Sequence, residues 1–264
     1  MTRKDMARAD FRSPRLHVED ALAADATIAL GKPQAHYLRN VLRLEAGDPV
    51  LVFNGRDGEW RATIAGTSKR PALTVTEQTR EQTAPLDLHY LFAPLKHERL
   101  DYMVQKAVEM GVSRLQPVLT RHVQMHRVNL DRMRANAIEA AEQCGILNLP
   151  AIGEPRPFDD VIAARKPERL LVFCDEGAEV KDPIAALAAA RAKPSAVVPV
   201  AAAEGGQPIA VLVGPEGGFA EEERAALLKL PNLVRLSLGP RILRADTAAV
   251  AALALVQAVL GDWK

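Results

Sequence analysis

The spacing of hydrophobic and polar positions changes at about residue 80. Before that point, short apolar runs alternate with turn residues, a pattern typical of strands. Pro49–Phe53 and Glu59–Ala65 flank residues 54–58, Asn-Gly-Arg-Asp-Gly, whose glycines favour positive φ and hence a hairpin. A third strand is predicted at Ala72–Glu77, and one short helix with Pro33 near its first turn interrupts the strands. Short strands around one helix predict a small β-barrel.

From Leu86 onward, predicted strands alternate with predicted helices, which is the pattern of a parallel α/β sheet. The predicted strands are Leu88–Ala93, Leu115–Leu119, Leu170–Cys174, Ile209–Val213 and Val234–Leu238. The predicted helices are Arg99–Met110, Leu130–Cys144, Pro183–Arg191, Glu221–Leu228 and Thr247–Leu260. The polar stretch Glu77–Pro85 separates the two regions, so we expect one domain over residues 1–80 and another over 81–264.

Several residues mark helix ends and loops. Asn129 is the expected N-cap of the helix that follows it, and Gly111 and Gly145 are expected to end their helices. The stretch Ala192–Pro208 is rich in Ala, Pro and Gly and is expected to form a surface excursion.

Composition narrows the class of protein. The formal net charge is only +1, so a nucleic-acid partner must be sought in local patches. Two cysteines without metal-ligand spacing argue against a disulfide framework, and the histidines also lack metal spacing, so no metal is assigned. Residues 1–15 lack the apolar segment of a secretory signal, and no apolar run reaches the roughly 18 residues of a membrane span. We therefore expect a soluble cytoplasmic protein.

A glycine-rich segment, residues 214–219 (Gly-Pro-Glu-Gly-Gly-Phe), lies between an apolar strand and a helix. Ligands of open α/β sheets bind beyond the carboxyl ends of strands, although a plain strand-to-helix turn explains a lone segment of this kind equally well. Glutamates fill the first turn of the next helix, Glu221–Glu223, and make it a poor phosphate cradle. The spacing also matches neither the dinucleotide fingerprint nor a P-loop. The segment therefore favours a cofactor held by backbone groups and carrying a positive centre.

A second segment, residues 236–247, also lies between a strand and a helix. Its Leu238-Gly239-Pro240 step requires an extended or turned backbone. Asp246 or Thr247 is expected to cap the final helix. Two arginines in this loop, Arg241 and Arg244, are harder to explain as structural.

The helix after residues 95–98 has two different faces. Leu100, Met103, Val104 and Ala107 form an apolar stripe for the core, and Arg99 lies on another face. Residues 96–136 hold eight Lys/Arg against four Asp/Glu, a local excess that indicates phosphate contact, with a solvated helix face as the competing interpretation. No Gly-x-Ser-x-Gly elbow or Cys/His pair supports a hydrolase.

Taken together, these segments resemble the RsmE family of ribosomal RNA uridine-N3 methyltransferases, within the knotted SPOUT superfamily. The resemblance is carried by residues 36–43, 105–112, 139–145, 214–219 and 238–244, in the family's order and spacing. It implies an α/β protein with an N-terminal PUA-like RNA-binding barrel and a C-terminal parallel sheet containing a trefoil knot. It also implies a homodimer, built largely on the knot.

The resemblance further implies S-adenosylmethionine as cofactor and a uridine of 16S ribosomal RNA, naked or in the small subunit, as substrate. The implied cofactor-binding residues are Val213, Gly214, Pro215, Glu216, Gly217, Gly218, Leu236, Ser237, Leu238, Gly239, Arg241, Ile242 and Leu243, with the turn 174–176 as a further contact. The candidate RNA-binding residues are Arg8, Arg12, Arg39, Lys96, Arg99 and Arg121.

Methylation of N3 requires loss of its proton and stabilisation of charge on O2 or O4. Arg244 is the candidate for the charge and Asp246 for the proton, with Glu216 in reserve. A helix cap explains Asp246 equally well.

Two departures from the family pattern matter. The last loop reads Arg-Ala-Asp-Thr-Ala at residues 244–248, where relatives commonly have Arg-Thr-Glu-Thr-Ala. Ile146-Leu147-Asn148 replace arginines that many relatives carry, which puts RNA contacts there in doubt. The alternative functions are a related knotted methyltransferase acting on tRNA and a non-catalytic RNA-binding protein.

Overall fold

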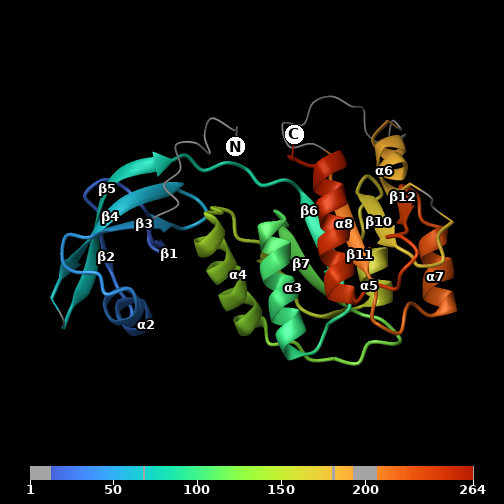
Figure 1. The fold of residues 1–264 in the computed structure, drawn as a ribbon, viewed down its shortest axis with the longest axis horizontal. Coiled ribbons are helices and arrows are strands. Elements are labelled where there is room, and N and C mark those ends of the chain that lie inside the picture. The colour runs from blue at the N-terminus through green and yellow to red at the C-terminus, as the bar shows by residue number, and fades with distance from the viewer. Residues whose placement is uncertain (1–12, 68, 180–181, 193–206, 264) are drawn as a thin grey trace. The chain divides into compact units, whose positions relative to one another are not determined.

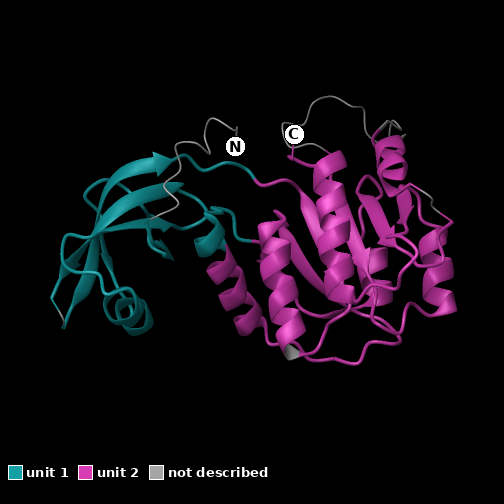
Figure 2. Cartoon of the chain, viewed as in Figure 1, with its two compact units in different colours: residues 1–84, 141–149 teal, residues 85–140, 150–264 magenta. Residues whose placement is uncertain are grey.

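The chain divides into two compact units in its computed structural model, which describes residues 13–67, 69–179, 182–192 and 207–263. Unit 1 comprises residues 1–84 and 141–149, and unit 2 comprises residues 85–140 and 150–264 (Figure 2). The predicted surface excursion lies largely outside the described residues. No helix of the described part is long and apolar enough to cross a membrane.

Unit 1 is a curled five-stranded sheet in the order β1-β3-β4-β5-β2. The strands are β1 (Arg15–His17), β2 (Thr27–Ala29), β3 (Pro49–Phe53), β4 (Glu59–Gly66) and β5 (Pro71–Arg80). The predicted helix is present as α2 (Lys32–His36), continued by a π-helical turn η1 (Tyr37–Val41). Strands β1 and β2 were not predicted, because three residues are too short to show a period.

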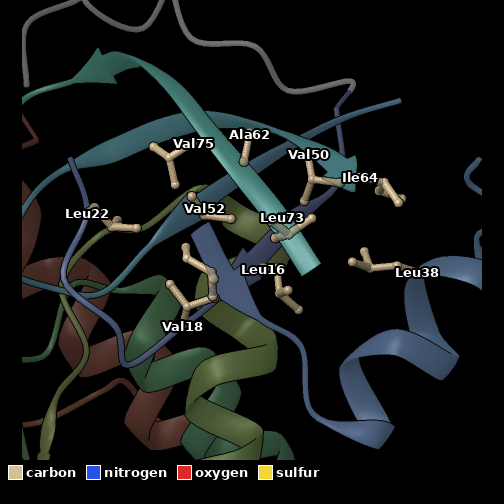
Figure 3. Packing of buried hydrophobic residues seen from close by; sticks show 11 residues of the cluster. Leu16, Val18, Leu22, Leu38, Val50, Val52, Ala62, Ile64, Leu73 and Val75 are labelled. Carbon is tan, nitrogen blue, oxygen red and sulfur yellow. The ribbon is translucent and has the colours of Figure 1, made fainter. Parts of the chain in front are cut away.

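The hairpin between β3 and β4 confirms the turn prediction. Gly55 and Gly58 have φ values of 77° and 81°, and the side-chain oxygen of Asn54 accepts the backbone N–H groups of Arg56 and Asp57. Side chains of β3, β4 and β5 pack with those of β1, β2 and η1 in one apolar cluster (Figure 3). Val50, Val52 and Leu73 are fully buried there.

A buried ion network ties the strands of unit 1 together. The Glu59 carboxylate, which is fully buried, accepts hydrogen bonds from Arg15 at 2.9 Å and from Arg80 at 2.6 Å. Burial raises the pKa of Glu59, but the hydrogen bonds from the two guanidinium groups outweigh burial and lower the pKa below its usual value. Strands β1, β4 and β5 are thus joined by charge as well as by their backbone ladders.

Residues 145–148 are structural parts of unit 1. The Gly145 carbonyl accepts a hydrogen bond from Arg80 at 2.9 Å, Leu147 is buried, and the Asn148 side chain accepts one from Gln82 at 2.6 Å. The Ile-Leu-Asn departure from the family pattern therefore supplies packing and hydrogen bonds at this point.

Unit 2 is a parallel sheet flanked by helices, as predicted (Figure 1). Its order is β12-β10-β11-β6-β7-β8, with β9 paired to β7. The strands are β6 (Leu88–Phe92), β7 (Arg114–Leu119), β8 (Ala151–Ile152), β9 (Arg156–Pro157), β10 (Leu170–Cys174), β11 (Ile209–Val213) and β12 (Leu233–Leu236). The helices are α3 (His97–Glu109), α4 (Leu130–Cys144), α5 (Phe158–Ala163), α6 (Pro183–Ala192), α7 (Glu221–Leu228) and α8 (Ala245–Val259). The last residues of α4, 141–144, belong to unit 1. The trefoil knot stays a prediction.

The helix-end predictions have mixed outcomes. Asn129 caps α4 by accepting the Arg132 N–H at 3.0 Å, and Gly111 and Gly145 take positive φ after α3 and α4, as predicted. The predicted cap of the final helix is wrong. Helix α8 begins at Ala245 with Arg244 at the N-cap position, because Ala245 is a good helix former and extends the helix.

Candidate functional site

A cavity of about 610 Å³ lies at the carboxyl ends of β10, β11 and β12. Three strand-to-helix segments line it, residues 173–177, 213–219 except Gly217, and 236–245, together with Arg224 and Ala248. All of these residues belong to unit 2. The cavity therefore forms at the edge where open parallel sheets bind ligands.

The structure brings the predicted cofactor-binding residues together around this cavity, with one exception. Gly217 is absent from the lining, and a Cβ added to it would lie 3.3 Å from the Cβ of His122. Of the candidate catalytic residues, Glu216 and Arg244 line the cavity and Asp246 does not. The turn at 174–176 also lines it.

The glycines of the 214–219 segment have different local tasks. Gly218 has a φ of +69°, and a Cβ there would meet nothing within 4 Å, so its bare backbone borders open space in the cavity. Gly214 instead makes room for the Phe219 ring, which would lie 2.5 Å from an added Cβ. That ring packs edge-on against Phe173 at 5.2 Å, so Gly214 serves packing of the cavity wall.

A second loop supports the glycine segment, and this contact was not predicted from the sequence. The Nδ1 atom of His122 lies 3.3 Å from the Gly218 carbonyl oxygen, and the Arg121 N–H donates to Glu223 at 2.8 Å. The same Glu223 carboxylate accepts the Ala220 N–H at 2.9 Å. Glu223 therefore joins the loop after β7 to the start of α7, which gives one of the three consecutive glutamates a definite task.

A buried carboxylate forms part of the cavity wall. Asp175 accepts hydrogen bonds from Arg235 at 2.8 Å and from Arg224 at 3.1 and 3.2 Å, and its other contact is the Gly177 N–H at 3.0 Å. Burial raises the pKa of Asp175, but the hydrogen bonds from the two arginines outweigh burial and lower it. The residue stays ionised next to the cavity. Burial raises the pKa of the neighbouring Cys174 thiol to about 12, so this thiol is protonated and a poor nucleophile.

Glu216, at the tip of the glycine segment, forms an ion pair with Arg99 of α3. From the sequence, these two residues were expected to have different tasks, and their contact was not predicted, because 117 positions separate them. Both side chains remain well exposed, so the pair lies where cavity and solvent meet.

Arg244 and Asp246 occupy the entrance of α8. Arg244 is exposed and lines the cavity. The Asp246 carboxylate accepts its neighbour's N–H, from Thr247, at 2.9 Å, and its charge is one of the smaller causes that raise the pKa of the buried Tyr90 hydroxyl. A carboxylate in the first turn also suits the helix dipole.

The candidate RNA-binding residues fall in three places. Arg8 and Arg12 lie outside the described residues, and Arg39 lies half-buried on η1 of unit 1. Lys96 and Arg99 lie at the start of α3, and Arg121 lies two residues after the end of β7. Because β6 and β7 are parallel neighbours, these last three residues share the sheet edge that carries the cavity.

Comparison with known proteins fits this geometry. Residues 82–257 match the model of an RNA methyltransferase domain, and residues 30–77 match that of an RNA methyltransferase PUA domain. The ribosomal RNA small subunit methyltransferase E of Rickettsia conorii is 29% identical over 245 residues, which cover 92% of this chain and 94% of that protein.

Two solved structures that are similar to this chain contain a bound ligand. One is the ribosomal RNA small subunit methyltransferase E of Neisseria gonorrhoeae bound to S-adenosylmethionine, with 25% identity, a TM-score of 0.78, and coverage of 96% of this chain and 100% of that one. The other is a methyltransferase of Legionella pneumophila in complex with the same cofactor, with 26% identity, a TM-score of 0.76, and coverage of 94% and 98%.

Proposed function

The chain belongs to the RNA methyltransferase family with an N-terminal PUA domain, the RsmE family, and we propose that it methylates N3 of a uridine in small-subunit ribosomal RNA with S-adenosylmethionine as methyl donor. The observation that carries the proposal is the cavity of unit 2, formed by three loops in a fold whose solved relatives bind this cofactor.

The residues around the cavity fit the cofactor's chemistry. A volume of about 610 Å³ lies within the usual range for small-molecule sites. Apolar side chains such as Leu236, Leu238 and Leu243 suit an adenine ring, and the backbone at Gly218 and Gly239 allows close approach. The carboxylates of Asp175, Glu176 and Glu216 suit a ligand with a positive sulfonium centre.

S-adenosylmethionine supplies a methyl group that is already activated, so the protein has to position the uridine and manage one proton. In our proposal, Arg244 stabilises negative charge on O2 or O4 of the uridine, since its exposed guanidinium group borders the cavity. Asp246 accepts the N3 proton, and Glu216 is the reserve acceptor. Asp246 follows Ala245, which begins α8 and lines the cavity, and in our proposal it acts on a substrate that enters over the start of α8.

Asp246→Asn separates a proton acceptor from a structural carboxylate. If Asp246 accepts the proton, this variant should lose roughly 10²–10⁴-fold in the rate of single-turnover methylation, while its affinity for the cofactor is unchanged. Raising the pH should partly restore the rate, because solvent then ionises N3. Arg244→Ala is the matched variant, and it should lose rate with little rescue at high pH. A near-normal rate for Asp246→Asn would leave proton removal to Glu216 or to water.

RNA affinity is assigned to both units in this proposal. The PUA domain supplies Arg39 and the basic N-terminal residues Arg8 and Arg12, and unit 2 supplies Lys96, Arg99 and Arg121 near the cavity. Arginine and lysine at such positions bind phosphates without reading sequence. The substrate is the small-subunit ribosomal RNA or the small subunit assembled on it, which places the enzyme in the cytoplasm.

A homodimer is the proposed assembly. An apolar groove of about 590 Å³ lies beside the cavity, between Pro183, the loop residues 237–239, the small residues of α8 and Trp263. Ile184, Ile242 and Trp263 are exposed large hydrophobic residues near it. A second copy on this face would bury them, and light scattering should give about twice 28.7 kDa. A monomer at micromolar concentration would contradict this assembly.

Mapping of methylated nucleotides in RNA from a strain lacking the gene tests the proposed function. We expect one uridine of the 16S ribosomal RNA to lose its N3 methyl group and to regain it when the purified protein and S-adenosylmethionine are added. A loss confined to tRNA would instead show a related tRNA methyltransferase. Unchanged methylation together with RNA binding would show a non-catalytic RNA-binding protein.

A further inference from the structure

The ion pair between Arg99 and Glu216 connects two sites with different ligands. Glu216 lines the cavity that we assign to the cofactor, and Arg99 lies at the start of α3 beside the exposed Lys96. The side chains are 39% and 49% exposed, so solvent and incoming ligands reach both of them. In the pair, one guanidinium nitrogen of Arg99 contacts one carboxylate oxygen of Glu216. An exposed arginine can exchange such a partner for a phosphate, which its planar guanidinium group can bind through two N–H groups.

The rest of the glycine segment is anchored without Arg99. The Gly218 N–H donates to the Pro215 carbonyl at 2.9 Å, and the Gly218 carbonyl contacts His122. Gly214 is held under the Phe219 ring. Loss of the Arg99 contact would therefore free the Glu216 side chain while the backbone of the segment keeps its place.

The charge of Glu216 has a different effect in the two arrangements. While Arg99 is bound to it, the two charges nearly cancel at the cavity. When a phosphate binds Arg99 in place of Glu216, Arg99 no longer cancels the carboxylate charge of Glu216. A cation in the cavity is then bound more tightly.

We propose that the Arg99–Glu216 pair is an electrostatic switch that makes RNA binding tighten the binding of the cationic methyl donor. This inference rests on the proposed function, since it takes RNA phosphate as the competitor and S-adenosylmethionine as the ligand. Because coupling between two sites is reciprocal, the methyl donor also tightens RNA binding by the same factor. The neutral thioether left after transfer loses this advantage, so the switch favours the substrate complex over the product complex.

Equilibrium dialysis of full-length protein with sinefungin tests the switch, because sinefungin carries an ammonium group near the sulfonium position and has no methyl group to transfer. Transcribed 16S ribosomal RNA should tighten sinefungin binding by about two- to fivefold, the size expected for one exposed ion pair. S-adenosylhomocysteine, which is uncharged at that position, should change by less than about 1.5-fold in the same comparison.

Variants of the two partners should remove the coupling in opposite ways. Arg99→Gln should bind sinefungin about two- to fivefold more tightly than wild type without RNA, and RNA should add nothing further. Glu216→Gln should bind it more weakly, again without a response to RNA. Arg132→Gln is the matched control, because it removes another exposed arginine, on α4, from its ion pair with Asp101 of α3, and it should leave both affinity and coupling unchanged.

The outcomes separate this inference from the proposed function. If sinefungin or RNA does not bind the wild-type protein, the proposed function fails. If both bind but the affinities are independent, if S-adenosylhomocysteine responds equally, or if Arg99→Gln keeps the coupling, the switch is wrong and the proposed function stands.

Discussion

Each unit contains a buried carboxylate held by two arginines, but the two clusters differ in their surroundings. Glu59 in unit 1 is fully enclosed between strands, and its partner Arg15 is only 3% exposed. Asp175 in unit 2 is also buried, yet its partners Arg224 and Arg235 are about one third exposed, and Arg224 borders the cavity. The same arrangement of charges is closed in one unit and open to a ligand in the other.

The difference indicates what each cluster does. A buried ion pair costs desolvation, so it adds little net stability, but removing one partner is strongly destabilising. In unit 1 the cluster around Glu59 joins strands β1, β4 and β5. In unit 2 the cluster around Asp175 keeps a negative charge and two oriented guanidinium groups at the wall of the cavity that we propose as the cofactor site, so we expect a change in this cluster to alter cofactor affinity.

Glu59→Gln should have the largest effect on folding. It removes the charge that both buried guanidinium groups contact, and we expect the free energy of unfolding of unit 1 to fall by about 3–5 kcal/mol. The chain has two tryptophans, Trp60 in unit 1 and Trp263 in unit 2, so Trp60 fluorescence in a Trp263→Phe background reports on unit 1 during urea unfolding.

Glu77→Gln is the matched control for this variant. Glu77 also pairs with an arginine across β4 and β5, to Arg61 at 2.9 Å, but both side chains are exposed. Its loss should cost less than about 1 kcal/mol. Equal losses in the two variants would contradict the view that burial gives the Glu59 cluster its importance.

The sequence predicted continuous elements well and tertiary pairings poorly. The strands 49–53, 170–174 and 209–213 and the helices 130–144 and 221–228 have the predicted bounds, because apolar runs and periodic stripes encode them locally. Strands β1, β2, β8 and β9 are two or three residues long and carry no such period. Figure 1 shows how the predicted helices of unit 2 lie against its parallel sheet.

The site illustrates the same limit. The position of the glycine-rich segment and of the 236–247 segment, each between a strand and a helix, was predicted from the sequence pattern. That both contact one cofactor was implied by the family resemblance. The support from His122, the Arg99–Glu216 pair and the two arginines on Asp175 were not predicted, since each joins residues dozens of positions apart without a local signal.

Asp175→Asn should lower the free energy of unfolding less than Glu59→Gln does, but it should weaken cofactor binding more. The arginines around it reach solvent, so the free energy of unfolding of unit 2 should fall by about 1–3 kcal/mol. Loss of a negative charge at the cavity wall should weaken S-adenosylmethionine binding by about three- to tenfold. Calorimetry measures this, and unchanged affinity would remove Asp175 from the site.

The smallest expected effect concerns acid. Burial, and then the nearby Arg169 guanidinium group, lower the pKa of His89 in unit 2 to about 4, so its Nε2–H donates to Asp87 while the ring is neutral. The unfolded chain binds this proton near pH 6.5, so the stability of unit 2 should fall between about pH 6.5 and 4. The buried carboxylate of Asp175 in unit 2, whose pKa is lowered, adds a further loss only below about pH 4. His89→Gln should flatten the upper part of this profile, and an unaltered profile would contradict the assignment.

Calorimetric titration with S-adenosylmethionine of wild type, Gly218→Val and Gly47→Val tests the central claim that the three-loop cavity is the cofactor site. Both glycines have positive φ and open space where a Cβ would lie, but Gly218 borders the cavity and Gly47 lies in unit 1. The backbone strain is thus matched, and only Gly218→Val fills the proposed site. We predict that Gly218→Val loses more than about tenfold in affinity and that Gly47→Val stays within about twofold of wild type. Wild-type affinity in Gly218→Val would contradict the account.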